Sequence, residues 1–151
     1  MKKTLLAVLA VCLCVFAFAG CSKDAAKDYN LAALSEKLMA EDIFSDILSP
    51  VPEQTAAKVY GFEAEDVKDT ILYCSTGATT EEIGMFKCTD EAAAARVLEK
   101  AKARIESQKT AYVSYAPGEV PKLEDSFVKS DGVYVFYVVS VDNAKVAEII
   151  K

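Results

Sequence analysis

The sequence predicts an α+β domain: a mostly antiparallel four-stranded sheet with helices packed on one face, preceded by N-terminal helices and a cleaved signal segment. Three observations support this fold class. Two pairs of β-rich runs are each joined by a short turn. Each pair is followed by a polar cap and an alanine-containing helical segment. The length of 151 residues suits a single domain once the N-terminal segment is set aside.

The first 20 residues have the pattern of a secretory signal. Lys2 and Lys3 form a basic start, and the apolar run from Leu5 to Phe18 is shorter than the roughly 20 residues that a membrane span needs. The run ends in Phe18-Ala19-Gly20-Cys21, which resembles the bacterial lipobox, where small residues precede a cysteine that is diacylated before cleavage. We therefore expect a lipoprotein signal peptide over residues 1–20 and lipidation, with palmitate, at Cys21. The alternatives are an ordinary signal cut near residue 19 or 20, or an uncleaved anchor.

The remaining chain is then expected to consist of an acylated cysteine with a short polar tether, residues 21–30, and one α+β domain, residues 31–151. Loss of Lys2 and Lys3 would move the formal charge from -6 to -8. Two acyl chains are enough for stable anchoring. The expected partner of Cys21 is the cell membrane, on its extracytoplasmic face, and the acidic charge disfavours nucleic acid.

The helices are predicted from apolar spacing. Leucines spaced for one helical face indicate an amphipathic helix over 29–41 that continues loosely to Leu48, and the Pro50 and Pro52 segment stops it. A short helix over 53–59 ends at Gly61. The longest helix is predicted from Glu91 to about Lys109, capped by Thr89 or Asp90.

The strands are predicted from β-branched and aromatic runs. The first pair covers 70–74 and 83–88 around a turn at 77–80. The second pair begins at Phe127, turns at Asp131-Gly132 as a type I′ hairpin, and continues over 133–141. Residues 112–121 are expected to form a linker between them, and Asp142 to cap a final helix. Both faces of the last strand are apolar, so it should lie mid-sheet, covered on both sides or exposing a binding patch.

The chain has no histidine, which excludes Ser-His-Asp and Cys-His catalysis and imidazole metal ligation. No cofactor, metal site or catalytic residue is predicted. The acidic residues Glu63, Glu65, Asp66 and Asp69 lack a calcium-loop pattern and suit a helix start. Glu81 and Glu82 are expected in a solvated turn, and as neighbours on a strand their side chains should point to opposite faces.

Two cysteines, Cys74 and Cys88, belong to the domain. A turn at 77–80 places their sulfurs on one face but about 13 Å apart, too far for a disulfide. Buried free thiols are therefore expected. A wider loop centred on Glu81 would instead place the two cysteines opposite each other and allow a bridge.

Four tyrosines form the candidate contact group for a ligand or partner: Tyr112, Tyr115, Tyr134 and Tyr137. Tyrosine suits interfaces because it combines apolar area with a polar tip. The ordinary alternative is that they are half-buried strand and linker residues. The resulting hypothesis is a surface-exposed, non-catalytic module that binds an envelope protein or small ligand. The competing hypothesis is an envelope enzyme with carboxylate or Ser-Lys chemistry, and a third is a spacer of other envelope components.

Several blocks resemble a known family. They include Leu31-Ala32-Ala33-Leu34, Tyr60-Gly61, the segment from Gly77-Ala78-Thr79-Thr80 to Phe86-Lys87, and Gly132-Val133-Tyr134-Val135-Phe136. Over residues 29–151 the chain is similar to the bacterial domain-of-unknown-function family 4358, short lipoproteins mostly of Firmicutes. The resemblance implies a lipoprotein and an α+β fold. It carries no catalytic residue over to this chain.

Overall fold

The computed structural model describes residues 27–151, which form helices and strands joined by loops. In chain order the elements are α2 (Leu31–Met39), β1 (Ser49–Pro50), α3 (Glu53–Tyr60), η1 (Ala64–Asp66), β2 (Val67–Cys74), β3 (Glu82–Cys88), α4 (Glu91–Tyr115), η2 (Pro117–Glu119), α5 (Val120–Glu124), β4 (Phe127–Asp131), β5 (Tyr134–Val139) and α6 (Asn143–Ile149). No helix in this range is long and apolar enough to cross a bilayer.

The sheet has five strands in the order β1-β2-β3-β5-β4, and every neighbouring pair is antiparallel. The α+β class is confirmed, whereas the predicted count of four strands is one too low. The additional strand, β1, has only two residues, which pair with Tyr73 and Cys74. A proline-containing dipeptide carries no local strand signal, and only its long-range partner makes it a strand.

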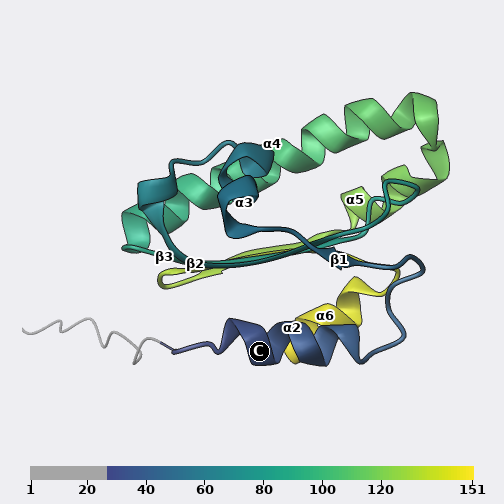
Figure 1. Cartoon of the computed structure of the whole chain (residues 1–151). Helices are drawn as coiled ribbons and strands as arrows, with labels where there is room; N and C mark the ends of the chain where they lie inside the picture. The colour runs from purple at the N-terminus through teal and green to yellow at the C-terminus, as the bar shows by residue number, and fades with distance from the viewer. Residues whose placement is uncertain (1–26) are drawn as a thin grey trace, which may run out of the picture.

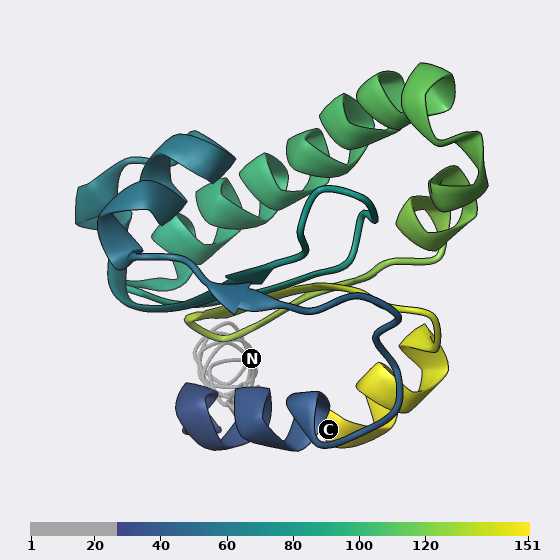
Figure 2. The ribbon, with the colours of Figure 1, turned by 45° about the vertical axis from the view of Figure 1, so that its right-hand side comes forward.

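Helices cover both faces of the sheet, so the prediction of helices on one face was wrong. Figures 1 and 2 show α3, α4 and α5 above the sheet and α2 with α6 below it. Both faces of β5 are apolar, and all six of its residues are buried, so helices must cover the sheet on both sides. The first of the two alternatives for that strand, cover on both sides, is therefore the observed one.

Each face has its own apolar core. The core on the side of α3, α4 and α5 includes Phe62, Leu72, Phe86, Val97, Ala101 and Leu123. The core on the side of α2 and α6 includes Leu31, Leu38, Ile83, Met85, Phe136 and Val146.

Helix α4 is six residues longer than the predicted end near Lys109. The Asp90 side chain accepts from the Ala93 N–H at 2.7 Å and begins the helix as expected. At the other end, the Tyr112 hydroxyl donates to the Thr79 carbonyl oxygen at 2.8 Å. That tertiary contact favours helix where the sequence predicted a linker, and the rest of the expected linker forms η2 and the start of α5.

The β2–β3 hairpin keeps the two cysteines apart. Cys74 lies opposite Glu82, and Cys88 lies opposite Val67 at the other end of the hairpin. Both are free thiols, as expected, but only Cys88 is buried, whereas Cys74 is half-buried. Burial, followed by the charge of Glu82, raises the pKa of Cys74 to about 12. Burial, followed by the charge of Asp66, raises the pKa of Cys88 to about 11.

The β4–β5 hairpin has the expected two-residue loop, but its residues are Gly132 and Val133, since Asp131 pairs with Tyr134. Gly132 has φ of 57°, and no residue other than glycine has positive φ in the described chain. A positive φ at the first loop position alone fits a type II′ turn rather than the predicted type I′.

Candidate functional site

Two adjacent glutamates at the start of β3 are buried, contrary to the predicted solvated turn. Glu81 is 1% exposed and Glu82 is 2% exposed. Their carboxylates contact separate partners, so they do not form a paired acid and base. No local sequence signal indicates this burial, because the cations that pair with the two glutamates, Arg104 and Lys122, are distant in the sequence and only the fold brings them close.

Glu82 is the centre of a buried polar network beneath α4. The Tyr60 hydroxyl donates to Glu82 Oε1 at 2.5 Å. Arg104 donates from Nε to Oε1 at 2.8 Å and from Nη2 to Oε2 at 2.5 Å. Gln108 Nε2 lies 3.4 Å from Oε2, and its carbonyl oxygen accepts from the Tyr137 hydroxyl at 2.5 Å. We call these five residues the Glu82 network.

Burial and neighbouring charges shift the pKa values of Tyr60 and Arg104 in the Glu82 network. Burial and the Glu82 charge raise the pKa of Tyr60 well above its usual value, so its hydroxyl remains a donor. Burial alone would lower the pKa of Arg104, but the hydrogen bonds and charge of Glu82 outweigh it and raise that pKa. A two-point guanidinium–carboxylate contact with every lone pair engaged is typical of a structural ion pair.

Gly84 makes room for this network. A Cβ atom at that position would overlap the Tyr60 hydroxyl. Gly84 lies within β3 opposite Leu72 and Tyr137, where glycine normally weakens a strand. Its role here is to let Tyr60 reach across the strand to Glu82.

Glu81 joins three segments at the same end of the sheet. Its Oε2 accepts from the backbone N–H groups of Ser45 and Asp46 at 2.8 and 2.9 Å. Its Oε1 accepts from the Ser45 hydroxyl at 2.5 Å and from Lys122 Nζ at 2.8 Å. Lys122 also pairs with Glu119 at 3.0 Å. The carboxylate therefore fastens α5 to the loop between α2 and β1.

Ser45 and Lys122 are the pair that Ser-Lys chemistry would require, with Lys122 Nζ 3.4 Å from Ser45 Oγ. The protonation of Lys122 and the hydrogen bond of Ser45 do not fit such a catalytic pair. A catalytic lysine must be neutral to take the serine proton. Here burial would lower the pKa of Lys122, but Glu81 and Glu119 outweigh it and raise that pKa. The Ser45 hydroxyl already donates to Glu81, so the arrangement fits a structural clamp.

The four predicted contact tyrosines do not form one group. Tyr134 and Tyr137 are 2% and 0% exposed and lie in the separate cores of the two faces. Tyr112 and Tyr115 are neighbours at the end of α4, with ring centroids 5.9 Å apart. Tyr115 is 72% exposed. The predicted lipidation residue, Cys21, lies outside the described residues.

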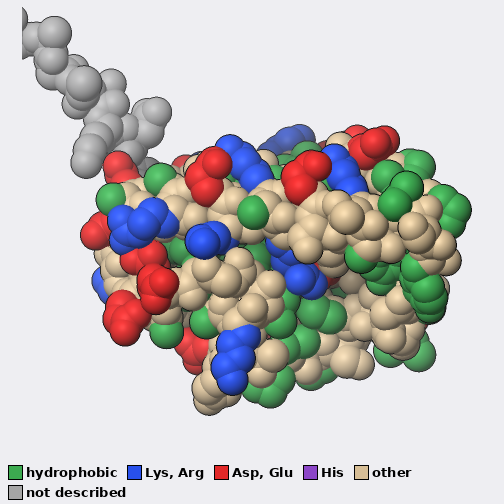
Figure 3. All heavy atoms as spheres, turned by 90° about the horizontal axis from the view of Figure 1, so that it is seen from above, with side chains coloured by type: hydrophobic (Ala, Val, Ile, Leu, Met, Phe, Trp, Pro, Cys, Tyr) green, Lys and Arg blue, Asp and Glu red, His purple; other side chains and the backbone are tan. Residues whose placement is uncertain are grey.

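Large exposed apolar side chains gather at one end of the molecule. In residues 27–151 they are Met39, Ile47, Val113, Tyr115 and Val141. Three contacts bring these residues to the same end. Ile47 follows Asp46, whose N–H donates to Glu81, and the Val141 N–H donates to the Ile43 carbonyl oxygen. The Tyr112 hydroxyl fixes the end of α4 to the β2–β3 loop. We call this the loop end of the domain. Figure 3, viewed onto α4, shows hydrophobic side chains gathered toward its right-hand end, where α4 finishes.

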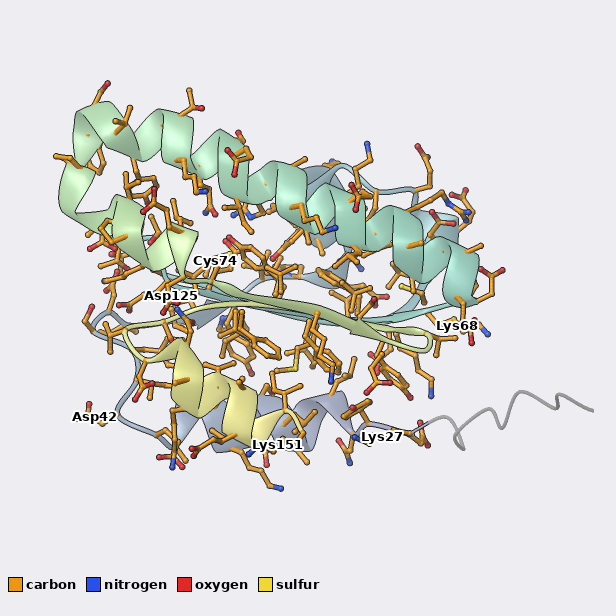
Figure 4. The ribbon with its side chains drawn as sticks, turned by 180° about the vertical axis from the view of Figure 1, so that it is seen from behind. Lys27, Asp42, Lys68, Cys74, Asp125 and Lys151 are labelled. Carbon is orange, nitrogen blue, oxygen red and sulfur yellow. The ribbon has the colours of Figure 1, made fainter. Side chains whose placement is uncertain are left out.

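The described chain begins at the opposite end. Lys87 Nζ pairs with Asp28 at 3.2 Å, and the Tyr134 hydroxyl donates to Asp28. The Tyr29 hydroxyl donates to Asp131 at 2.6 Å. In Figure 4, Lys27 and Lys68 lie toward one end of the sheet and Cys74 toward the other. The entry of the chain and the loop end are thus separated by the length of the strands.

Fold and contacts together define a three-layer α+β domain whose sheet is joined to its helices by buried ion pairs. The comparison with protein families identifies it further. A model described as Domain of unknown function (DUF4358) matches residues 45–140, and the chain belongs to this family. No curated protein and no solved structure matches the chain.

Proposed function

We propose that this protein is a membrane-anchored, surface-exposed lipoprotein whose domain binds a partner through its loop end. The observation that carries the proposal is the opposite placement of two features. The described chain enters at Asp28 and Tyr29, fastened to Lys87 and Asp131. The exposed apolar side chains lie at the far end.

The distance from the proposed anchor favours this orientation. Five residues separate Cys21 from Lys27, and the six steps from one to the other span at most about 20 Å. The entry end would therefore remain close to the bilayer. Helix α4 has 25 residues and a length of about 37 Å, and it begins at the entry end. Tyr115 would then face away from the membrane, where a protein partner could reach it.

The lipid anchor is tested by metabolic labelling of the full chain with radioactive palmitate. We expect label on the wild type and none on Cys21→Ala, because diacylation requires that thiol. The matched control is Cys12→Ala, which should keep the label because Cys12 lies within the predicted signal. Label that persists in Cys21→Ala would contradict the anchor.

Binding at the loop end is tested by a photo-crosslinking amino acid placed at Tyr115 in intact cells. We expect a discrete protein adduct at this position, because a partner would cover the exposed ring. The control position is Lys100, which is exposed on the same helix. Equal adducts at both positions, or none at Tyr115, would argue against the loop end as the contact surface.

A further inference from the structure

The outer edge of β2 is paired along only part of its length. On its inner side β2 pairs with β3 from Val67 to Cys74. On its outer side β1 reaches only Tyr73 and Cys74, and the Val51 N–H donates to the Leu72 carbonyl at 2.8 Å. Within the described residues no strand pairs with the outer side of residues 67–71. Such an edge presents backbone groups that an additional strand can pair with.

The direction of these groups follows from the ladder. The Leu72 carbonyl faces β1, and backbone groups alternate between the two sides of a strand. The N–H and carbonyl of Thr70 therefore face the same open side as those of Leu72. Asp69 and Ile71 direct theirs toward β3. Thr70 is the central donor and acceptor of the free edge.

A hollow of about 290 Å³ lies beside this edge, between β2 and α3. Its lining includes Ala57 and Phe62 and the edge residues Val67 and Thr70. A strand added next to Thr70 would direct alternate side chains to this face of the sheet. The hollow would accept one apolar side chain of that strand, and the mostly apolar floor would exclude a charged one.

Acidic residues surround the hollow and the edge. Glu53 lies on its rim, and Glu63, Glu65 and Asp69 nearby are exposed. Asp69 lies on the opposite face of β2 from Thr70, because neighbouring strand residues alternate. The fourth acidic residue of this segment, Asp66, is already paired with Arg96. Lys68 on the edge itself is exposed, and its Nζ lies 3.4 Å from the Thr89 carbonyl oxygen. Within the described residues the four unpaired carboxylates outnumber this cation, and the excess of negative charge favours a basic partner.

We propose that the free edge of β2 binds an extended basic segment of a partner protein by strand addition, with one apolar side chain in the hollow beside α3. The free edge of five residues is at most about 16 Å long, and a β-bulge between Val67 and Asp69 leaves residues 69–71 as its regular part. A segment of five or six residues covers this length. Alternate basic side chains of this segment would lie on the Asp69 face. This surface is separate from the loop end and does not depend on the lipid anchor.

The probe for this site is a fluorescent hexapeptide of alternating lysine and valine or leucine, titrated against the full chain in detergent. We expect saturable binding that shows as a rise in anisotropy. Two altered peptides should bind at least about tenfold more weakly. One carries N-methyl groups on alternate amides, which removes the donors of a strand, and the other has glutamate in place of lysine. No saturation up to about 1 mM, or equal binding by the N-methylated peptide, would overturn the proposal.

Variants test the same site from the protein side. Thr70→Pro removes the outward N–H without removing a bond to β3, so it should weaken binding about tenfold or more, while Thr70→Val should not. Ala57→Leu fills the hollow from α3 and should weaken binding without changing the edge. Circular dichroism and the urea midpoint check folding of each variant. If Thr70→Pro does not fold, the other two measurements decide. Unchanged peptide binding by Ala57→Leu, or equal binding of the N-methylated peptide to the wild type, would overturn the proposal.

Discussion

The two faces of the sheet are held by different interactions. The face under α3, α4 and α5 combines an apolar core with the buried Glu82 network, whereas the face under α2 and α6 has an apolar core and an exposed ion pair, Lys87–Asp28, at its margin. The region matched by the family model also separates the two helix layers. Its model matches residues 45–140, which include the strands and α3 to α5 but exclude α2 and α6.

The two helix layers differ in how strictly their side chains fix the position of the helices on the sheet. A buried ion pair requires its partner, because one charge left alone in the interior is costly. It therefore fixes α4 in one position over β3. An apolar layer is less demanding, since many side chains of similar volume can fill it. The layer formed by the two ends of the chain is of this second kind.

The largest expected effect breaks the Glu82 network. Glu82→Ala should lower the free energy of unfolding by about 3–5 kcal/mol, because it leaves Arg104 without its carboxylate. Urea denaturation measures it. The double variant Glu82→Met with Arg104→Met should lose less than either single variant, since no charge is then left unpaired. A double variant that loses the sum of both single losses would show that the two residues act independently.

On the other face, Leu38→Ala should lower the free energy of unfolding by about 3 kcal/mol through the cavity it leaves, because Leu38 is fully buried on α2. Leu38→Met, which conserves volume, should cost less than about 1.5 kcal/mol. The same urea titration compares them. If Leu38→Met lowered the free energy of unfolding as much as Leu38→Ala, the face under α2 and α6 would depend on exact side-chain shape as strictly as the face under α4 depends on its ion pair.

The smallest expected effect concerns pH and Glu81. Burial raises the pKa of Glu81, but Lys122 and Ser45 outweigh it and lower that pKa below 4.5. A lowered pKa in the folded state contributes stability that is complete above the unfolded value and is lost as the pH falls through the folded value. At about pH 7, Glu81→Gln should cost about 1–3 kcal/mol.

The difference between wild type and Glu81→Gln should then narrow as the pH falls below the unfolded value and through the lowered folded value, because the wild-type carboxylate becomes protonated there. Urea midpoints at several pH values provide the measurement. The control is Glu99→Gln, at a side chain 70% exposed on α4, which should differ little from wild type at any pH. A constant difference for Glu81→Gln would exclude its titration as the cause.

The sequence was informative where local signals decide the structure. Asp90 begins α4, Gly132 occupies the hairpin loop, and the apolar pattern of β5 locates the central strand. It was less informative where distant residues decide. The glutamates at 81 and 82 resemble a polar turn until Arg104 and Lys122 approach them, and the two-residue β1 is a strand only because β2 lies beside it.

The placement of α6 also has a consequence for biosynthesis. Val146 and Ile150 are buried against the face that includes Ile83 and Phe136. That face stays without part of its cover until α6 has been made. Folding of this layer therefore completes only after α6 has been made, and a shortened chain ending at Val139 would leave its apolar strands open to aggregation.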